Sequence, residues 1–173
     1  VLSGTPFDEY PETGIYCFTE TPDRKYVVVG IRGKGEGDTW GQIIAAPVGS
    51  TAFNQDVSNP IKESVYVEGN EEIGIARSEL RGLTCIGVYR QEPGSGADSH
   101  IFMYRAKLTV SGEEIIERHA DAMRMYEWLL NKSKGDNSAK TAYARAKMEL
   151  VAKRDRQFPR DPWENAGGLQ LLR

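Results

Sequence analysis

The sequence predicts an α/β (α+β) protein, in which strands precede and follow an acidic helix and two further helices come near the end. Residues 14–108 contain short runs of apolar, β-branched and aromatic residues, separated by segments rich in Gly and Pro. Residues 111–156 instead repeat their apolar positions at helical spacing. The chain has 173 residues, 39% of them hydrophobic, which is enough to bury the core of one domain of ordinary size.

The N-terminal third predicts β structure. Residues 14–20 and 25–32 form two strand-like runs, and Pro22 occupies a favoured place in the turn between them, so we expect a hairpin. Residues 43–46 predict a further strand. We expect this strand to end in a turn at Pro47-Val48-Gly49.

A helix follows, because Asn59 is a favoured N-cap residue and Pro60 fits the first helical position. Gly74 is a common residue just after a helix end. The helix carries three carboxylates within five residues, Glu68, Glu71 and Glu72.

Residues three and four apart are neighbours on a helical surface, so these carboxylates repel one another by roughly 0.2–0.5 kcal/mol per pair. A bridging cation would remove this repulsion, and oxygen ligands favour Mg²⁺, Mn²⁺ or Ca²⁺ over Zn²⁺. The alternative is an ordinary solvated helix face, since Glu is a good helix former. This alternative predicts that replacing all three by Gln leaves the protein at least as stable.

Downstream of the acidic helix, residues 83–89 and 100–108 predict two strands that a loop rich in Gly, Pro and Ser separates. Ser111 and Glu114 fit the capping box of a second helix, whose apolar face runs along residues 115–130. A third amphipathic helix is predicted over residues 138–156.

One segment between these strands resembles the second half of the Nudix box, the signature of the Nudix hydrolase family. It reads Val67-Glu68-Gly69-Asn70-Glu71-Glu72-Ile73-Gly74-Ile75. That half reads Arg-Glu-aliphatic-x-Glu-Glu-x-Gly-aliphatic. Pro47-Val48-Gly49 looks like the Pro-Gly-Gly turn that opens the box, and Trp40 stands where such proteins often carry an aromatic residue. The resemblance covers roughly residues 12–131.

The chain departs from the family pattern at four points. Val67 replaces the Arg that orients the carboxylates, and no Lys can be assigned to that task. Gly69 replaces an aliphatic residue, which leaves a core position to be filled by another side chain. Asn59 stands where the family has its first Glu, and about four extra residues separate Gly49 from it. The box is therefore degenerate in its first half.

The resemblance implies a mixed β-sheet sandwiched between helices over residues 1–131, with an added C-terminal helix and extended tail over residues 132–173. It implies a pyrophosphohydrolase of the Nudix type, cleaving a diphosphate linkage in a nucleoside diphosphate-X type substrate. Its metal ligands are Glu68, Glu71 and Glu72, which hold Mg²⁺ or Mn²⁺, and Glu71 and Glu72 are its catalytic residues. The general base is one of these carboxylates or an unassigned loop carboxylate, and the substrate-binding residues are unknown. The alternative is a catalytically inactive Nudix-like binding or assembly module.

The C-terminal part differs in charge from the rest. Residues 134–173 carry nine basic and five acidic residues, a balance of +4, whereas residues 1–133 carry thirteen and twenty, a balance of −7. The basic part would either fold back on the acidic body or contact a protein partner or a second copy of the chain, and nucleic acid stays an open alternative. No apolar run reaches the length of a membrane span and no signal-peptide pattern is present, so we expect a cytoplasmic protein with no membrane partner.

Overall fold

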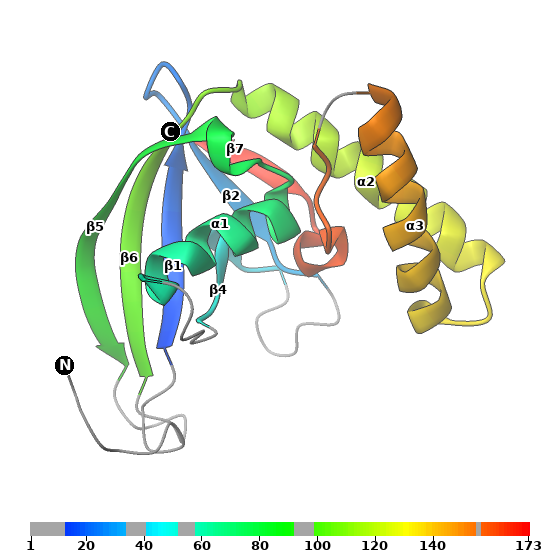
Figure 1. Ribbon diagram of the computed structural model, residues 1–173, viewed down its shortest axis with the longest axis horizontal. Coiled ribbons are helices and arrows are strands. Elements are labelled where there is room, and N and C mark those ends of the chain that lie inside the picture. Colours follow the sequence, from blue (N-terminus) through cyan, green and yellow to red (C-terminus); the bar gives the residue numbers. More distant parts are fainter. Residues whose placement is uncertain (1–12, 34–40, 52–57, 92–98, 155–156) are drawn as a thin grey trace.

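The computed structural model of the chain describes residues 13–33, 41–51, 58–91, 99–154 and 157–173. These residues form one mixed β-sheet of seven strands with three α-helices and two short 3₁₀-helices, which confirms the predicted α+β class (Figure 1). The strands are β1 (Thr13–Glu20), β2 (Val27–Ile31), β3 (Ile43–Ala45), β4 (Val48–Ser50), β5 (Leu80–Gln91), β6 (Ser99–Leu108) and β7 (Leu169–Leu172). The helices are α1 (Pro60–Ile73), η3 (Arg77–Glu79), α2 (Gly112–Lys132), α3 (Asp136–Arg154) and η4 (Pro162–Asn165).

The sheet is built around β1. Its strand order is β3-β2-β1-β6-β5, while β4 pairs with β1 and β7 pairs with β2. The predicted hairpin of β1 and β2 is present, with Glu20 opposite Val27. β1 runs parallel to β6, and the other pairings are antiparallel. Because successive strand residues point to opposite faces, Ile15 and Cys17 are fully buried while Tyr16 and Phe18 are about 40% exposed.

Two strands were not expected from the sequence. Val48 and Gly49 were predicted to lie in a turn, but they belong to β4, where they face Tyr16 and Ile15 across the sheet. The turn is confined to the residues before them. β7 belongs to the tail and pairs with β2, so the last strand of the sheet comes from the far end of the chain. Trp40 lies outside the described residues.

The helix ends follow the sequence signals. The Asn59 side chain accepts a hydrogen bond from the backbone N–H of Lys62 at 3.0 Å, and Pro60 begins α1. Gly74 ends α1 in the left-handed conformation, with φ of 68°. The Ser111 hydroxyl likewise accepts a hydrogen bond from the N–H of Glu114 at 3.1 Å and begins α2. The sequence predicted each of these ends correctly because capping depends on neighbouring residues.

The helices pack in two places. α1 packs against β1 and β4, and α2 packs against β7, α1 and α3. The main hydrophobic core lies between α1 and the sheet, whereas a second cluster joins α2, α3 and Phe158 of the tail. Ile75 fills the position that Gly69 leaves open, since a Cβ at Gly69 would lie 3.0 Å from the Ile75 Cδ1. Among the described helices, none combines the length and apolar character that a bilayer crossing requires.

Candidate metal centre

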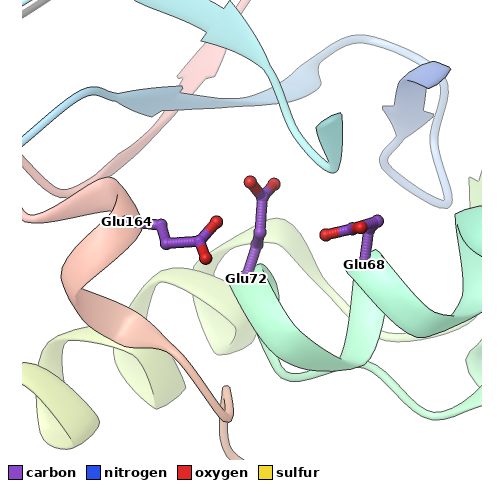
Figure 2. Close-up of side chains that lie close together, drawn as sticks. All are labelled: Glu68, Glu72 and Glu164. Atoms are coloured by element: carbon purple, nitrogen blue, oxygen red, sulfur yellow. The ribbon is translucent and has the colours of Figure 1, made fainter. Parts of the chain in front are cut away.

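Three carboxylates from two distant segments meet at the end of α1. Glu68 and Glu72 lie one turn apart on α1, and Glu164 comes from η4 in the tail. Figure 2 shows the three side chains pointing toward one another. One oxygen of each carboxylate lies within 4.8 Å of the others, a separation that a single cation can bridge. These three residues are called the acidic cluster below.

Glu72 is the most deeply buried member of the acidic cluster, with no solvent exposure. Its Oε2 accepts a hydrogen bond from the backbone N–H of Val48 at 2.9 Å. Its Oε1 is also buried but has no hydrogen-bond partner among the described residues. Burial, together with the nearby Glu164 carboxylate, raises the pKa of Glu72 well above its ordinary value. A buried carboxylate oxygen without a partner is costly, so this position calls for a proton or a cation.

Glu68 is half-buried beside it. Its carboxylate lies directly over the backbone of Gly49, where a Cβ would overlap it. Burial and the neighbouring carboxylates of Glu71 and Glu164 raise the pKa of Glu68 to about 7, although Arg160 acts in the opposite direction. Since two of the three members have raised pKa values, the acidic cluster does not accept three negative charges easily by itself.

Glu71 has different surroundings from the two neighbours with which it was predicted to bind metal. Its carboxylate forms an ion pair with the guanidinium of Arg160, and the structure does not group it with Glu68 and Glu72. Its backbone carbonyl accepts a hydrogen bond from the N–H of Asp161 at 2.8 Å. Burial raises the pKa of Glu71, and Arg160 opposes this effect. Position 67 is a valine, so the guanidinium that pairs with a carboxylate of this helix comes from Arg160 in the tail.

The tail segment that brings Arg160 and Glu164 is held at several points. The backbone N–H of Arg160 donates to the Asn70 carbonyl at 3.3 Å, so it satisfies an acceptor in the last turn of α1. The Tyr143 hydroxyl of α3 donates to the Pro159 carbonyl at 2.6 Å. His119 of α2 contacts the Pro162 carbonyl through Nε2 at 3.1 Å. These anchors fix the segment on both sides of Arg160.

His119 takes part in this anchoring and not in a metal site. It is buried, and burial lowers its pKa to about 4, so it is neutral at ordinary pH. The neutral ring donates its Nε2 proton to the Pro162 carbonyl. His119 therefore has a structural role, which is to hold the tail segment against α2.

Arg118 secures the other side of the α1 end. Its guanidinium is nearly fully buried and donates to the Gly74 carbonyl at 3.2 Å. The same group pairs with Glu79 through hydrogen bonds of 2.9 and 3.0 Å. Arg118 of α2 thus holds the turn that follows α1, directly after Glu72 and Ile73.

Of the carboxylates that the sequence singled out, the structure brings Glu68 and Glu72 together with Glu164, and the sequence indicated neither Glu164 nor Arg160. The tail carries Asp161-Pro162 and large apolar residues, but these residues do not say which part of the fold the tail packs against. Glu164 lies 92 residues after Glu72, and no local spacing connects the two. Only the fold brings them together.

The residues present fit a divalent cation. Carboxylate oxygens are the ligands that Mg²⁺, Mn²⁺ and Ca²⁺ prefer, and the acidic cluster contains no thiolate or imidazole that would favour zinc. Glu72 contributes a fully buried carboxylate to it, one oxygen of which has no partner among the described residues. Burial, and after it the repulsion between neighbouring carboxylates, raises the pKa values of Glu68 and Glu72, and a cation here would offset both effects.

No protein-family model matches the chain, and a search of curated proteins finds no similar sequence. Solved structures that resemble it include a Deinococcus radiodurans protein, with 12% identity and a TM-score of 0.43 over 64% of this chain and 65% of that one. A MutT/nudix family protein from Enterococcus faecalis has 16% identity and a TM-score of 0.45 over 60% of this chain and 39% of that one. A MutT protein from Methanosarcina mazei Go1 has 18% identity and a TM-score of 0.42 over 82% and 96%. At these identities and TM-scores the likeness says nothing of the activity of this chain.

Proposed function

We propose that the protein is a hydrolase that depends on Mg²⁺ or Mn²⁺ and cleaves a diphosphate linkage in a substrate of the nucleoside diphosphate-X type. The observation that carries this proposal is the buried carboxylate of Glu72, which lies with two further carboxylates and has one oxygen, Oε1, without a partner among the described residues. The likeness of residues 67–75 to the Nudix box supplies the reaction class. The cation ligands in this proposal are Glu68, Glu72 and Glu164.

The chain's own residues divide the work. A divalent cation, when bound, polarises a phosphoryl oxygen and lowers the pKa of water. The Val48 N–H fixes the Glu72 carboxylate beside Glu68 and Glu164. Glu71 stays outside the ligand set and has a raised pKa, which makes it our candidate to accept the proton of the attacking water. Arg160 orients the Glu71 carboxylate.

The test has two readouts, cation binding and turnover. We expect isothermal titration to detect Mn²⁺ binding to the parent protein, and a phosphate-release assay to detect hydrolysis of some nucleoside diphosphate derivatives. Glu72→Gln should lose both. Glu127→Gln is the matched control, because Glu127 is an exposed carboxylate on α2 away from the acidic cluster.

Each result has a separate meaning. Binding of Mn²⁺ without turnover on any diphosphate substrate would favour the alternative, a binding or assembly module with a cation site. Absence of Mn²⁺ binding at millimolar concentration would overturn both the cation site and the hydrolase.

A further inference from the structure

A cavity lies on the sheet away from the acidic cluster. It has a volume of about 390 Å³, and it lies where β1 ends and β5 begins, beside the last residues of β6. Its walls carry four basic side chains and one acidic one, Arg24, Arg81, Arg105, Lys107 and Glu20. Its size falls in the range of small-molecule sites. We call it the basic pocket.

The positive charge of the basic pocket is mostly unbalanced. Glu20 pairs with Arg105 through contacts of 2.7 and 3.0 Å, so the negative charge of Glu20 balances the positive charge of Arg105. Arg24, Arg81 and Lys107 have no ion pair among the described residues. This leaves three cations around one cavity, on a part of the chain that carries a net charge of −7 over residues 1–133.

The turn before β2 explains why Arg24 lacks a partner. Asp23 is its sequence neighbour, but that carboxylate accepts a hydrogen bond from the Thr21 hydroxyl at 2.6 Å and pairs with Lys25 at 3.6 Å. Arg24 itself has a positive φ of 59°, which is uncommon for a residue with a long side chain. Arg24 therefore lines the basic pocket without an ion-pair partner among the described residues.

The strand register also brings like charges together. Arg81 and Lys107 are directly opposite partners across β5 and β6, an arrangement that is destabilising for two cations. An irregularity of the ladder between Arg81 and Thr84, with Gly82 at φ of 62°, alters the direction of β5 at this point. An anion between the two cations would turn this repulsion into attraction.

The basic pocket is separate from the acidic cluster. Arg105 is the β6 partner of Phe18, whose side chain is on the partly exposed face of β1. Cys17 and Thr19, on either side of Phe18, are buried on the opposite face. α1, which carries Glu68 and Glu72, packs on that buried face of the sheet. The two sites therefore lie on opposite faces.

From these observations we propose that the basic pocket binds a small organic phosphate through Arg24, Arg81 and Lys107. Guanidinium groups bind phosphate oxygens in pairs, and lysine adds a point charge. Ile86 lines the same cavity, is 53% exposed and offers apolar surface to the organic part of such a ligand. The cavity is of small-molecule size, which favours a free phosphorylated compound over a nucleic-acid strand.

The experiment is isothermal titration of the full chain with ATP and with tripolyphosphate, in EDTA so that no cation site contributes. We expect both probes to bind. The double variant Arg81→Gln with Lys107→Gln should weaken binding by about tenfold or more, since each charged contact contributes more than a neutral one. Arg24→Asn, a change suited to a positive φ, should weaken binding without altering the sheet.

The matched control removes two positive charges elsewhere. Lys134→Gln with Arg145→Gln changes two exposed residues outside the basic pocket and should leave the affinity within about twofold at equal ionic strength. Equal weakening by both double variants, or no binding of either probe at millimolar concentration, would overturn the proposal. Tighter binding of a short single-stranded oligonucleotide than of ATP, lost in the Arg81 and Lys107 variant, would assign the pocket to nucleic acid and equally overturn it. The EDTA condition makes the result independent of the proposed hydrolase.

Discussion

At the scale of single residues, the two oxygens of the Glu72 carboxylate have different surroundings. Oε2 accepts a hydrogen bond from the Val48 N–H, while Oε1 is buried without a partner among the described residues. The hydrogen bond to one oxygen fixes the side chain. A buried oxygen without a hydrogen bond is unusual, and a bound ion would satisfy it. The Glu72 carboxylate is thus held in place by one oxygen, and its other oxygen is available to the proposed cation.

Glu164→Gln tests whether the tail supplies a ligand. We expect the affinity for Mn²⁺ to fall by about tenfold to a hundredfold, because even outer-shell partners of a metal site have effects of that size. Glu71→Gln should change Mn²⁺ affinity less, since Arg160 already occupies the Glu71 carboxylate. The measurement is isothermal titration with Mn²⁺. A larger loss in Glu71→Gln than in Glu164→Gln would restore Glu71 as a ligand and remove Glu164.

The raised pKa of Glu68, about 7, predicts a pH-dependent stability. Between its unfolded value near 4.5 and about 7, the folded state binds more protons at Glu68 than the unfolded state does, so the free energy of unfolding falls as pH rises. We expect the melting temperature in EDTA to decline from pH 5 to pH 8, and to decline less in Glu68→Gln. Saturating Mn²⁺ should restore stability most at the high end of this window. Identical pH profiles for the parent and Glu68→Gln would contradict the raised pKa.

Gly49 is required for the position of Glu68 because the carboxylate lies over its backbone. Gly49→Ala should displace that carboxylate, reduce Mn²⁺ affinity by about tenfold, and lower stability by about 1–3 kcal/mol as overpacking does. Gly87→Ala is a matched strand control, since a Cβ there would meet only the flexible end of Met103. Titration with Mn²⁺ and thermal unfolding check both variants. Unchanged Mn²⁺ affinity in Gly49→Ala would show that Glu68 is not held by this contact.

At the scale of elements, the tail segment before β7 has two tasks. Its backbone N–H groups at Arg160 and Asp161 satisfy carbonyls in the last turn of α1, and η4 brings Glu164 to the acidic cluster. Helix ends leave such carbonyls without intrahelical partners, so the tail acts as a cap for α1. The segment is consequently coupled to the state of the acidic cluster.

This coupling predicts that cation binding holds the tail in place. In the absence of a cation, repulsion between Glu164 and the two α1 carboxylates opposes docking, and a bridging cation reverses it. We expect Mn²⁺ to slow amide hydrogen exchange at residues 158–166, and Glu164→Gln to remove the effect. Amides of β6 should respond little and serve as an internal control. Equal slowing across the whole chain would indicate general stabilisation instead.

How much the sequence could predict depends on the range of the interactions. Asn59, Gly74 and Ser111 mark helix ends through contacts with residues a few positions away, and all three were predicted correctly. β4 was mistaken for a turn because its pairing with β1 spans more than thirty residues and leaves no pattern in its own three. The same reason explains why the sequence did not indicate Glu164 or Arg160, whereas helical spacing predicted that Glu68 and Glu72 lie close together, as they do.

At the scale of the whole molecule, the sheet separates two sites of opposite charge. α1 and η4 place the acidic cluster on one face, while the end of β1, the start of β5 and the end of β6 form the basic pocket on the other. Strand alternation produces this separation, since adjacent residues of β1 and β6 point to opposite faces. The opposite charges of the two sites would favour ligands of opposite sign at the two faces.

If the two sites are independent, their variants should be additive. We expect the double variant Arg81→Gln with Lys107→Gln to leave Mn²⁺ affinity within about twofold of the parent, and Glu164→Gln to leave ATP affinity in EDTA similarly unchanged. Combining all three substitutions should give a change in unfolding free energy within about 0.5 kcal/mol of the sum of the separate changes, as for distant sites without shared partners. Denaturant unfolding and the two titrations provide the measurements. A larger deviation would mean that the sheet transmits a change from one face to the other, and the charged residues of the basic pocket would then have to be counted among those that tune the acidic cluster.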